Sequence, residues 1–423
     1  MGVKAALLLL VSTLLMQGCD GDVEHYQSSW VHQALALQRQ LDVNQPLHRA
    51  TFIATHNSFN STAYTTPQSY YDPNQVYSIG NQLRMDVRAL ELDVHSFYTY
   101  DVTTKSFYPE LLLCHGTAQH IGCSPFDRPV GDGLEEIAAW LSEPDNTNEV
   151  LFIYIENHAS QDDRFTLADL VMESLGDYLY LPEKQGCNAI PEDLSKADIL
   201  AANKNIIIIS DGCSGIALSQ ILFGGFENSE DSTGYPTVNL SELMPAPQCI
   251  NNNVLFESSA SFIRMQEDRT VLSNLVGAAG KKVTAAEVSN MIDCEINLLG
   301  MDKLSPHDGR LQAAIWSWAE NEPVAASVFQ CALHNSSGRF ESESCYRTLR
   351  YACRDDASGE WFVSEDQGDW QQGQAVCGAM GLRFAVPFSG LDNGRLREAK
   401  QGLQEDDVWM HYRQQATGGW IAG

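Results

Sequence analysis

The feature that most constrains the fold is a series of short apolar, β-branched runs separated by helical patterns. Several runs are apolar throughout, as expected for parallel strands buried on both faces. The alternation predicts an α/β fold, and a closed (β/α)8 TIM barrel accounts for the number of runs. A doubly wound open sheet is the alternative, but neither a GxGxxG nor a P-loop supports it. The eight strand candidates are residues 51–55, 89–94, 111–114, 150–155, 205–209, 254–256, 296–299 and 313–318. The helical patterns cover 28–40, 133–141, 166–175, 268–279 and 285–293.

The chain is longer than such a barrel requires. It has 423 residues, 44% of them hydrophobic, whereas a TIM barrel alone typically takes about 250. We expect the barrel over 28–330. A small disulfide-rich, mainly β module is expected over 339–423, where the composition shifts toward Trp, Gly and Cys. The polar, glycine-containing stretch 224–237 is expected to form a lid or an insertion.

The charge balance limits the possible partners. The chain has 55 acidic and 26 basic residues, which gives a formal net charge of -29. A field of this sign repels nucleic acid and anionic membrane surfaces. We therefore expect no nucleic-acid partner. Adaptation to a salty or exported environment is the alternative explanation of the charge.

The first 19 residues have the pattern of an export signal. Lys4 precedes an apolar run over 5–16 that is short for a membrane span, and Gly18-Cys19 resembles the lipobox of bacterial lipoproteins. Cys19 is then the lipidation site. Ordinary signal cleavage is the alternative, because residues 16–17 depart from the commonest box. We expect an exported protein, either a periplasmic or cell-surface lipoprotein or a secreted one.

The cysteine content agrees with export. Of the 11 cysteines, ten remain when Cys19 is set aside, and an even number in an exported chain suggests disulfides. No CxxC pair is present, which argues against a thiolate zinc site. The pairing cannot be read from the sequence. Cys114 with Cys123 is the most local possibility.

Acidic side chains cluster where the strand candidates end. Residues i and i+2 of a strand point to the same side, so Glu91 and Asp93 share a face. Two carboxylates aimed into one barrel mouth are costly unless a cation joins them. Asn57 and Glu156, after neighbouring strands, add two more oxygen ligands. Three carboxylates and an amide oxygen suit a hard cation such as Ca²⁺.

Two histidines at strand ends are the candidates for proton transfer. His56 and His115 follow separate strand candidates and can stand on opposite sides of a bound phosphate. Imidazole titrates near neutrality and acts as a general acid or base. One would stabilise the pentacovalent phosphorane, and the other would move the leaving-group proton.

These motifs, in this order, resemble those of the calcium-dependent phosphoinositide phospholipase C family, over roughly residues 45–325. By that likeness His56 and His115 are the catalytic pair, and the metal ligands are Asn57, Glu91, Asp93 and Glu156. The implied reaction is attack by the inositol 2-hydroxyl on its own phosphodiester, which releases diacylglycerol and forms a cyclic inositol phosphate. The matching motifs are Thr55-His56-Asn57-Ser58, Leu90-Glu91-Leu92-Asp93, Cys114-His115-Gly116 and Ile155-Glu156-Asn157-His158.

The resemblance has limits that bear on the substrate. Eukaryotic members hold extra ring phosphates with lysines on the fifth strand, whereas this chain has no lysine there after Lys204. Plain phosphatidylinositol or a related phosphodiester at a membrane surface is therefore the expected substrate. Arg88 is a candidate phosphate contact, with a structural ion pair as the alternative. Trp316 and Trp318 are candidates for stacking on a sugar-like ring, with packing as the alternative.

Other functions remain as alternatives. Glycerophosphodiester phosphodiesterases also carry a Glu-x-Asp pair, but they begin with His-Arg-Gly where this chain has His56-Asn57-Ser58. Calcium-independent bacterial relatives place an Arg near the metal's position. Residues 339–423 weakly resemble part of a C-type-lectin-like fold without its calcium and sugar motif. A non-catalytic surface protein that binds glycan or lipid through this module is the third possibility, and a disulfide-stapled cap is the alternative role for the module.

Overall fold

A computed structural model describes residues 21–184, 186–210, 213–225, 237–238, 240–249, 263–271, 282–324, 330–402 and 407–423. The expected signal, Cys19 and the strand candidate 254–256 lie outside these residues, as does most of 224–237. The chain divides into two compact units. The first unit comprises 1–27, 44–284 and 296–308, and the second comprises 28–43, 285–295 and 309–423. Among the described residues, no helix has the length and apolarity that a bilayer span requires.

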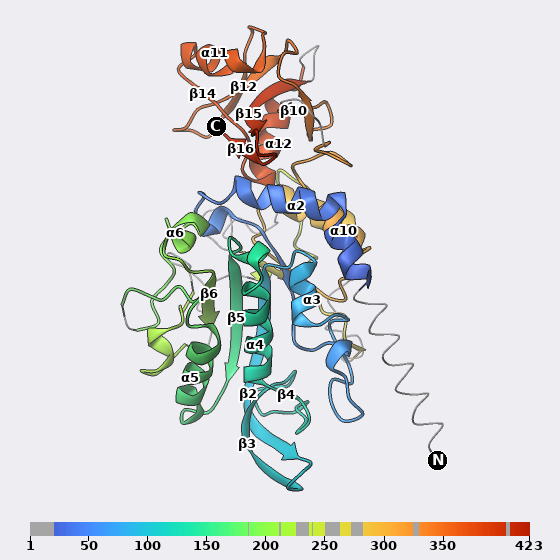
Figure 1. The fold of residues 1–423 in the computed structure, drawn as a ribbon, viewed down its shortest axis with the longest axis vertical. Helices are drawn as coiled ribbons and strands as arrows, with labels where there is room; N and C mark the ends of the chain where they lie inside the picture. The colour runs from blue at the N-terminus through green and yellow to red at the C-terminus, as the bar shows by residue number, and fades with distance from the viewer. Residues whose placement is uncertain are drawn as a thin grey trace, which may run out of the picture. The chain divides into compact units, whose positions relative to one another are not determined.

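The first unit is built on a parallel sheet that runs in chain order and returns to its first strand. β1 pairs with β2 on one side and with the last strand, β9, on the other. β5 and β6 continue from β2, Ile209 of β6 forms a parallel bridge with Phe223, and β8 joins β7 to β9. First and last strands that pair in this way make the TIM barrel expected from the sequence (Figure 1). The parallel strands are β1 (Phe52–Thr55), β2 (Ala89–Asp101), β5 (Leu151–His158), β6 (Ile206–Ser210), β7 (Thr237–Val238), β8 (Arg264–Gln266) and β9 (Leu298–Met301).

Two of the eight strand candidates do not form parallel barrel strands. The run 111–114 belongs to β3 (Ser106–Leu113), which returns antiparallel along β2. Only residues 102–105 join the two strands, too few for the crossover that a parallel pair requires. The run 313–318 begins at the end of helix α10 (Gly309–Ala313) and continues as loop in the second unit.

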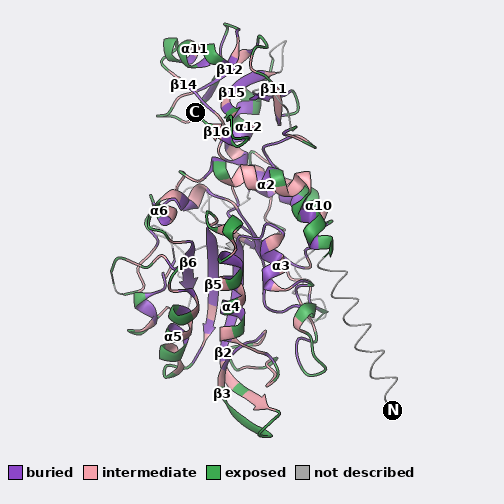
Figure 2. Ribbon diagram, in the orientation of Figure 1, coloured by how far each residue is buried: buried purple, intermediate pink, exposed green. Residues whose placement is uncertain are grey.

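Helices and short turns complete the first unit. The α-helices are α3 (Ile79–Arg84), α4 (Val130–Leu141), α5 (Asp163–Leu175) and α6 (Lys196–Ala201), and β4 (Arg128–Pro129) pairs with β3. The 3-10 helices are η1 (Leu47–Arg49), η2 (Thr62–Tyr64), η3 (Pro144–Asn146) and η4 (Leu218–Gln220). Helix α4 is amphipathic and buries Leu134, Ile137 and Leu141, in agreement with the predicted helix 133–141. Figure 2 shows β5 buried along most of its length.

The barrel interior changes from apolar to polar along each strand, and this change creates the site. Phe52 and Phe152 pack with ring centroids 6.0 Å apart in one buried cluster. On β5 the alternation then passes through Tyr154 to Glu156, and on β2 it passes from Ala89 to Glu91 and Asp93. Because every second residue of a strand faces the interior, the barrel is lined by apolar side chains near the strand starts and by carboxylates further along. We call the part lined by carboxylates the acidic mouth.

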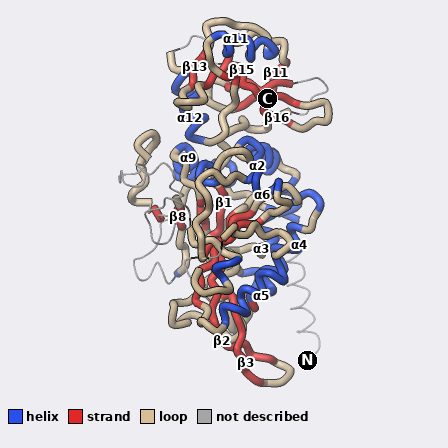
Figure 3. Tube along the Cα trace, turned by 90° about the vertical axis from the view of Figure 1, so that its left-hand side faces the viewer, coloured by secondary structure: helices blue, strands red, loops and turns tan. Residues whose placement is uncertain are grey.

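The second unit is a disulfide-linked β module with helices contributed by distant parts of the chain. Its strand order is β11-β10-β15-β12-β13, with β14 on β12 and β16 on β15. Disulfides join Cys331 to Cys345 and Cys353 to Cys377. Its strands are β10 (Gln330–His334), β11 (Phe340–Ser344), β12 (Arg350–Arg354), β13 (Trp361–Val363), β14 (Arg383–Phe384), β15 (Val408–Gln414) and β16 (Trp420–Ala422). Its helices are α2 (Trp30–Leu41), α9 (Ala285–Asp293), α10, α11 (Gly373–Ala379), α12 (Gly390–Ala399) and the 3-10 helix η5 (Trp370–Gln372) (Figure 3).

A buried amide ties the barrel together beside β9. The side chain of Asn297 is fully buried, and its Nδ2 donates to the carbonyls of His48 and Ala50 at 2.8 and 3.0 Å. Its Oδ1 accepts from the backbone N–H of Ile263 at 2.7 Å. One amide thus satisfies backbone groups that lead into both neighbours of β9.

We expect Asn297→Ala to lower the free energy of unfolding by about 2–4 kcal/mol, because it leaves buried backbone groups without partners. Urea unfolding monitored by circular dichroism measures the change. The exposed Asn148 offers a control, and Asn148→Ala should stay within about 0.5 kcal/mol of the parent. Equal stability of the two variants would contradict this role of Asn297.

Candidate active site

Three carboxylates meet between the first half of β2 and the carboxyl end of β5. Glu91, Asp93 and Glu156 each place an oxygen within 4.8 Å of the others. Asp93 and Glu156 are direct partners in the parallel register, and Glu91 precedes Asp93 by two residues. The structure therefore brings together the three carboxylates of the expected metal set.

Asn57 joins this group from the turn after β1. Its backbone has a φ of 46°, in the left-handed region that Asn tolerates better than most residues, and its N–H donates to Glu91 Oε2 at 3.1 Å. Its side-chain amide lies against Asp93. With the amide nitrogen toward Asp93 it donates hydrogen bonds of 3.2 and 3.0 Å to the two carboxylate oxygens. With the amide oxygen toward Asp93, this oxygen faces the carboxylate oxygens, and all of them are acceptors. Only a cation between them would make that orientation favourable.

The donor set fits a hard cation. Three carboxylates and an amide oxygen supply the oxygen ligands that Ca²⁺ prefers. Part of the acidic charge is already balanced, because Arg264 Nη1 lies 3.3 Å from Glu91 Oε1 and Gln266 Nε2 lies 2.6 Å from both Glu91 oxygens. Glu156 contacts His158 Nε2 at 2.7 Å. One arginine does not neutralise three carboxylates, so the mouth stays acidic.

His56 stands at the end of β1 among acidic groups. Its Nδ1 lies 3.4 Å from Asp302 Oδ1, and its Nε2 lies 3.9 Å from Glu91 Oε2. Burial alone would lower the pKa of His56, but Glu91, Asp302 and Asp268 outweigh it and raise the pKa to about 10. The imidazole is therefore held cationic between the acidic mouth and Asp302.

Asp302 is a site residue that the sequence interpretation missed. It is fully buried, follows β9 directly and lies with His56 and Asp268 in a second cluster of potential ligand atoms. Its Oδ2 accepts from Asn74 Nδ2 at 3.0 Å and from the N–H of Arg269 at 2.6 Å. A carboxylate directly after a strand was the available signal, but β9 is only a weak strand candidate in the sequence.

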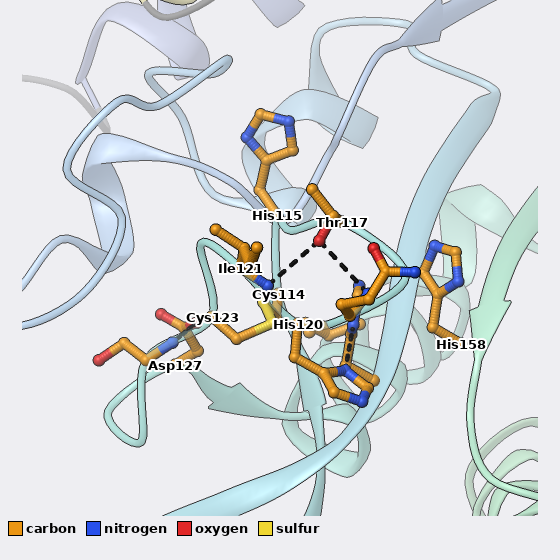
Figure 4. Close-up of a disulfide and its surroundings, with 12 residues drawn as sticks. Cys114, His115, Thr117, His120, Ile121, Cys123, Asp127 and His158 are labelled. Carbon is orange, nitrogen blue, oxygen red and sulfur yellow. Dashed lines mark hydrogen bonds between the residues drawn. A yellow bond between two sulfur atoms is a disulfide. The ribbon is translucent and has the colours of Figure 1, made fainter.

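His115 follows β3 and is held by a disulfide-clamped loop (Figure 4). The predicted pairing of Cys114 with Cys123 is confirmed. Within the loop, Thr117 Oγ1 accepts from the backbone N–H groups of Gln119 and Ile121 at 3.3 Å. Burial and the nearby His56 lower the pKa of His115. The two candidate catalytic imidazoles thus occupy unlike electrostatic environments.

An asparagine pair connects the two imidazoles. Asn60 Nδ2 lies 3.2 Å from His115 Nδ1 and donates to Asn74 Oδ1 at 2.7 Å. Asn74 Nδ2 in turn lies 3.3 Å from His56 Nδ1. Both asparagines are buried, and both come from the 57–77 connection rather than from strand ends. The pair therefore places one connected set of side-chain amides against both rings.

A pocket of about 420 Å³ opens beside His115. Its walls include Asn60, Tyr71, Ile121 and Asp127. A volume of this size accommodates a small polar headgroup. The pocket thus places a candidate binding space next to one of the two imidazoles.

Three further histidines lie behind the acidic mouth. His95 Nδ1 is 2.9 Å from His120 Nδ1, and the rings of His95 and His158 are 4.6 Å apart between centroids. Burial and the neighbouring histidines lower the pKa of His95 to about 3, so its ring is neutral. His158 thus contacts both the neutral ring of His95 and the carboxylate of Glu156.

The residues proposed for substrate contact lie elsewhere. Arg88 is buried just before β2 begins, three residues ahead of Glu91. Its Nε donates to Glu149 Oε2 at 2.9 Å, and its guanidinium lies 4.7 Å from the centre of the Trp140 ring. The structural ion pair therefore accounts for Arg88.

The two tryptophans belong to the aromatic core of the second unit. Trp316 and Trp318 are buried, and the Trp318 ring lies 4.7 Å from that of Trp420. Packing, rather than stacking on a sugar, accounts for both rings.

Comparison with known proteins gives one family and several distant structures. The sequence model of the Rv2075c PI-PLC-like domain matches residues 16–308. The uncharacterized protein Rv2075c of Mycobacterium tuberculosis is 32% identical over 407 residues, covering 92% of this chain and 80% of that protein. The phosphatidylinositol-specific phospholipase C of Listeria monocytogenes is 14% identical, with a TM-score of 0.39 over 64% of this chain and 95% of its own. A calcium-dependent phosphoinositol-specific phospholipase C from Pseudomonas sp. is 14% identical, with a TM-score of 0.38 over 65% and 94%.

The asparagine network leads to a spectroscopic test. We expect Asn74→Ala to shift the imidazole ¹⁵N resonances of both His56 and His115, because Asn74 contacts His56 and orients the amide of Asn60. Long-range ¹H–¹⁵N spectra of the histidine rings provide the measurement. Asn148→Ala is the control and should leave both rings unchanged. A shift confined to His56 would show that the network does not reach His115.

The pocket wall leads to a pH-dependent test. Burial raises the pKa of Asp127 to about 7, whereas an unfolded Asp titrates near its ordinary value. The folded state therefore binds the extra proton, so the ionised carboxylate destabilises it increasingly as pH rises toward 7 and fully above it. Asp127→Asn, which can still accept from the N–H of Ser124, should raise the Tm at pH 8 and leave it nearly unchanged at pH 4. Scanning calorimetry at the two pH values checks this, and a gain at pH 4 equal to that at pH 8 would contradict it.

Proposed function

Because the chain belongs to the Rv2075c PI-PLC-like family, we propose that it is a Ca²⁺-dependent phospholipase C-like enzyme. The proposed substrate is phosphatidylinositol or a related inositol phosphodiester at a membrane surface. The observation that carries the proposal is the convergence of Glu91, Asp93 and Glu156 beside His56, with His115 linked to the same network.

The proposed roles follow from the positions of the side chains. Asn57, Glu91, Asp93 and Glu156 would hold the cation, which when bound supplies charge neutralisation for the phosphate and a lower pKa for a coordinated hydroxyl. In the reaction, the bond from the inositol 2-oxygen to phosphorus forms as the bond to the diacylglycerol oxygen breaks. One proton moves overall from the ring hydroxyl to the leaving oxygen. His56 and His115 are the groups proposed to stabilise the phosphorane and to manage this transfer.

The proposed substrate does not need phosphate groups on the inositol ring other than the phosphodiester itself. The fifth strand candidate of the sequence, which is β6, reads Ile-Ile-Ile-Ile-Ser over 206–210, without a lysine. Lys204 precedes it, and its Nζ donates to the carbonyls of Gly176 and Asp177. No cation on this strand is therefore offered to a phosphorylated ring.

We also propose that the protein is exported. All ten cysteines among the described residues are disulfide-bonded, which supports an oxidising compartment. Cys19 remains the proposed lipidation site, with secretion after ordinary cleavage as the alternative. Contact of 339–423 with glycan or lipid stays a prediction from the sequence.

The metal proposal predicts a direct binding result. Ca²⁺ should bind the parent and raise its Tm, because it relieves repulsion among the three carboxylates. Asp93→Asn should weaken binding by roughly tenfold or more, because it removes a charged ligand. Calorimetric titration gives the affinity, and Asp101→Asn on the same strand is the control. Full phosphodiesterase activity in excess chelator would reject the metal role.

The histidine proposal predicts loss of turnover without loss of fold. His56→Ala and His115→Ala should each lower kcat on phosphatidylinositol by about 10²- to 10⁴-fold, the range expected for a lost acid–base group. The exposed His307 supplies the control, and His307→Ala should retain parental rates. Release of cyclic inositol phosphate, followed by ³¹P NMR, measures turnover. A panel that includes glycerophosphodiesters separates the proposed substrate class from the alternative.

A further inference from the structure

The antiparallel ribbon formed by the outer part of β2 and by β3 extends beyond the barrel strands. Figure 1 and Figure 3 both show it reaching past helix α5. Its register pairs Tyr98 with Pro109 and Tyr100 with Phe107. Directly opposed residues lie on the same face, so these four side chains form one face, here called the aromatic face.

The aromatic face is strongly exposed. Tyr98 and Phe107 retain 55% and 60% of their accessible surface. Tyr100 packs between Phe107 and Phe126, with ring centroids 5.0 and 5.7 Å apart. The opposite face mixes aromatic and polar side chains, and it carries Phe97, Thr99, Asp101, Ser106, Tyr108 and Glu110. Both carboxylates of this part of the ribbon therefore lie opposite the aromatic face.

One segment connects the aromatic face with the pocket beside His115. The backbone N–H of Tyr100 donates to the carbonyl of Pro125 at 3.0 Å, just after the loop that the disulfide closes. That loop carries Ile121, which lines the pocket and is 73% exposed. Tyr71 also lines the pocket and is 74% exposed. Exposed apolar side chains thus occur both at the pocket rim and on the ribbon that the following segment contacts.

We propose that the aromatic face and the pocket rim dock the protein on a zwitterionic phospholipid surface, an inference that rests on the proposed function because a lipid headgroup must then reach the pocket. Tyr and Phe suit the boundary between water and acyl chains. The aromatic face carries no ionisable acid or base other than tyrosine. With a net charge of -29, attraction to anionic lipid cannot supply the binding energy. Aromatic insertion therefore selects a neutral lipid surface.

The test measures binding rather than turnover. Residues 21–423, which include every described residue, are co-sedimented with phosphatidylcholine vesicles in chelator. The double variant Tyr98→Ser, Phe107→Ser should reduce partitioning by about tenfold or more, because two large exposed aromatic side chains are lost. Tyr108→Ser is the matched control, since Tyr108 is an exposed aromatic on the opposite face of the same ribbon, and it should change partitioning by less than about twofold. High salt should not release the parent.

The outcomes separate this inference from the proposed function. Selective loss in the double variant supports docking even if phosphatidylinositol is not cleaved. Absence of vesicle binding by the parent, or equal loss in the double variant and the control, overturns it. Circular dichroism confirms that each variant is folded. A parent that forms a dimer broken by the double variant, without binding vesicles, would assign the face to a second copy of the chain and reject the lipid surface.

Discussion

The repulsion among Glu91, Asp93 and Glu156 is the constraint on which the candidate site depends. Three carboxylates within 4.8 Å of one another repel when they are charged, so they require compensating charge. Arg264 and the cationic ring of His56 supply part of it. The barrel can hold such a group because each carboxylate extends from a strand segment whose neighbouring residues are buried. The free energy gained on folding thus offsets the repulsion among these carboxylates.

The two imidazoles are held by different means, which explains their different environments. His56 leaves β1 and meets Asp302, so it stands between two acidic groups. His115 follows β3 and is held in place by the Cys114–Cys123 disulfide and by Asn60. The asparagine pair contacts both rings with neutral amides. The difference in charge between the rings therefore comes from the acidic groups around His56.

The strand-end residues could be predicted because the alternation of two residues and the chemistry of carboxylates are local properties. Glu91 and Asp93 are readable from their spacing alone. β3 was misassigned because the run 111–114 looks like any buried strand, and its direction depends on the short connection before it. Helices α2, α9 and α10 belong to the second unit. This placement depends on which apolar surfaces pack together, and the hydrophobic periodicity of the sequence does not specify that.

Asn60, Asn74 and Asp302 were missed for a different reason. The asparagines are in an irregular connection, where no period indicates which side chains turn inward, and Asn is common in exposed loops. Their burial becomes visible only when the 57–77 segment covers the barrel mouth. Asp302 follows the rule that identified the other acids, but the rule could be applied only where the strand itself was recognised.

β2 links the acidic mouth to the surface through a single alternation. One side of this strand presents Glu91 and Asp93 to the barrel mouth, while the other side buries Leu92 and Val94. Beyond the barrel the side of Leu92 and Val94 continues through Tyr98 and Tyr100, where half-buried and exposed rings replace buried aliphatic ones. The aromatic face and the acidic mouth are therefore parts of one continuous strand, and the same period of two residues sets which side chains belong to each.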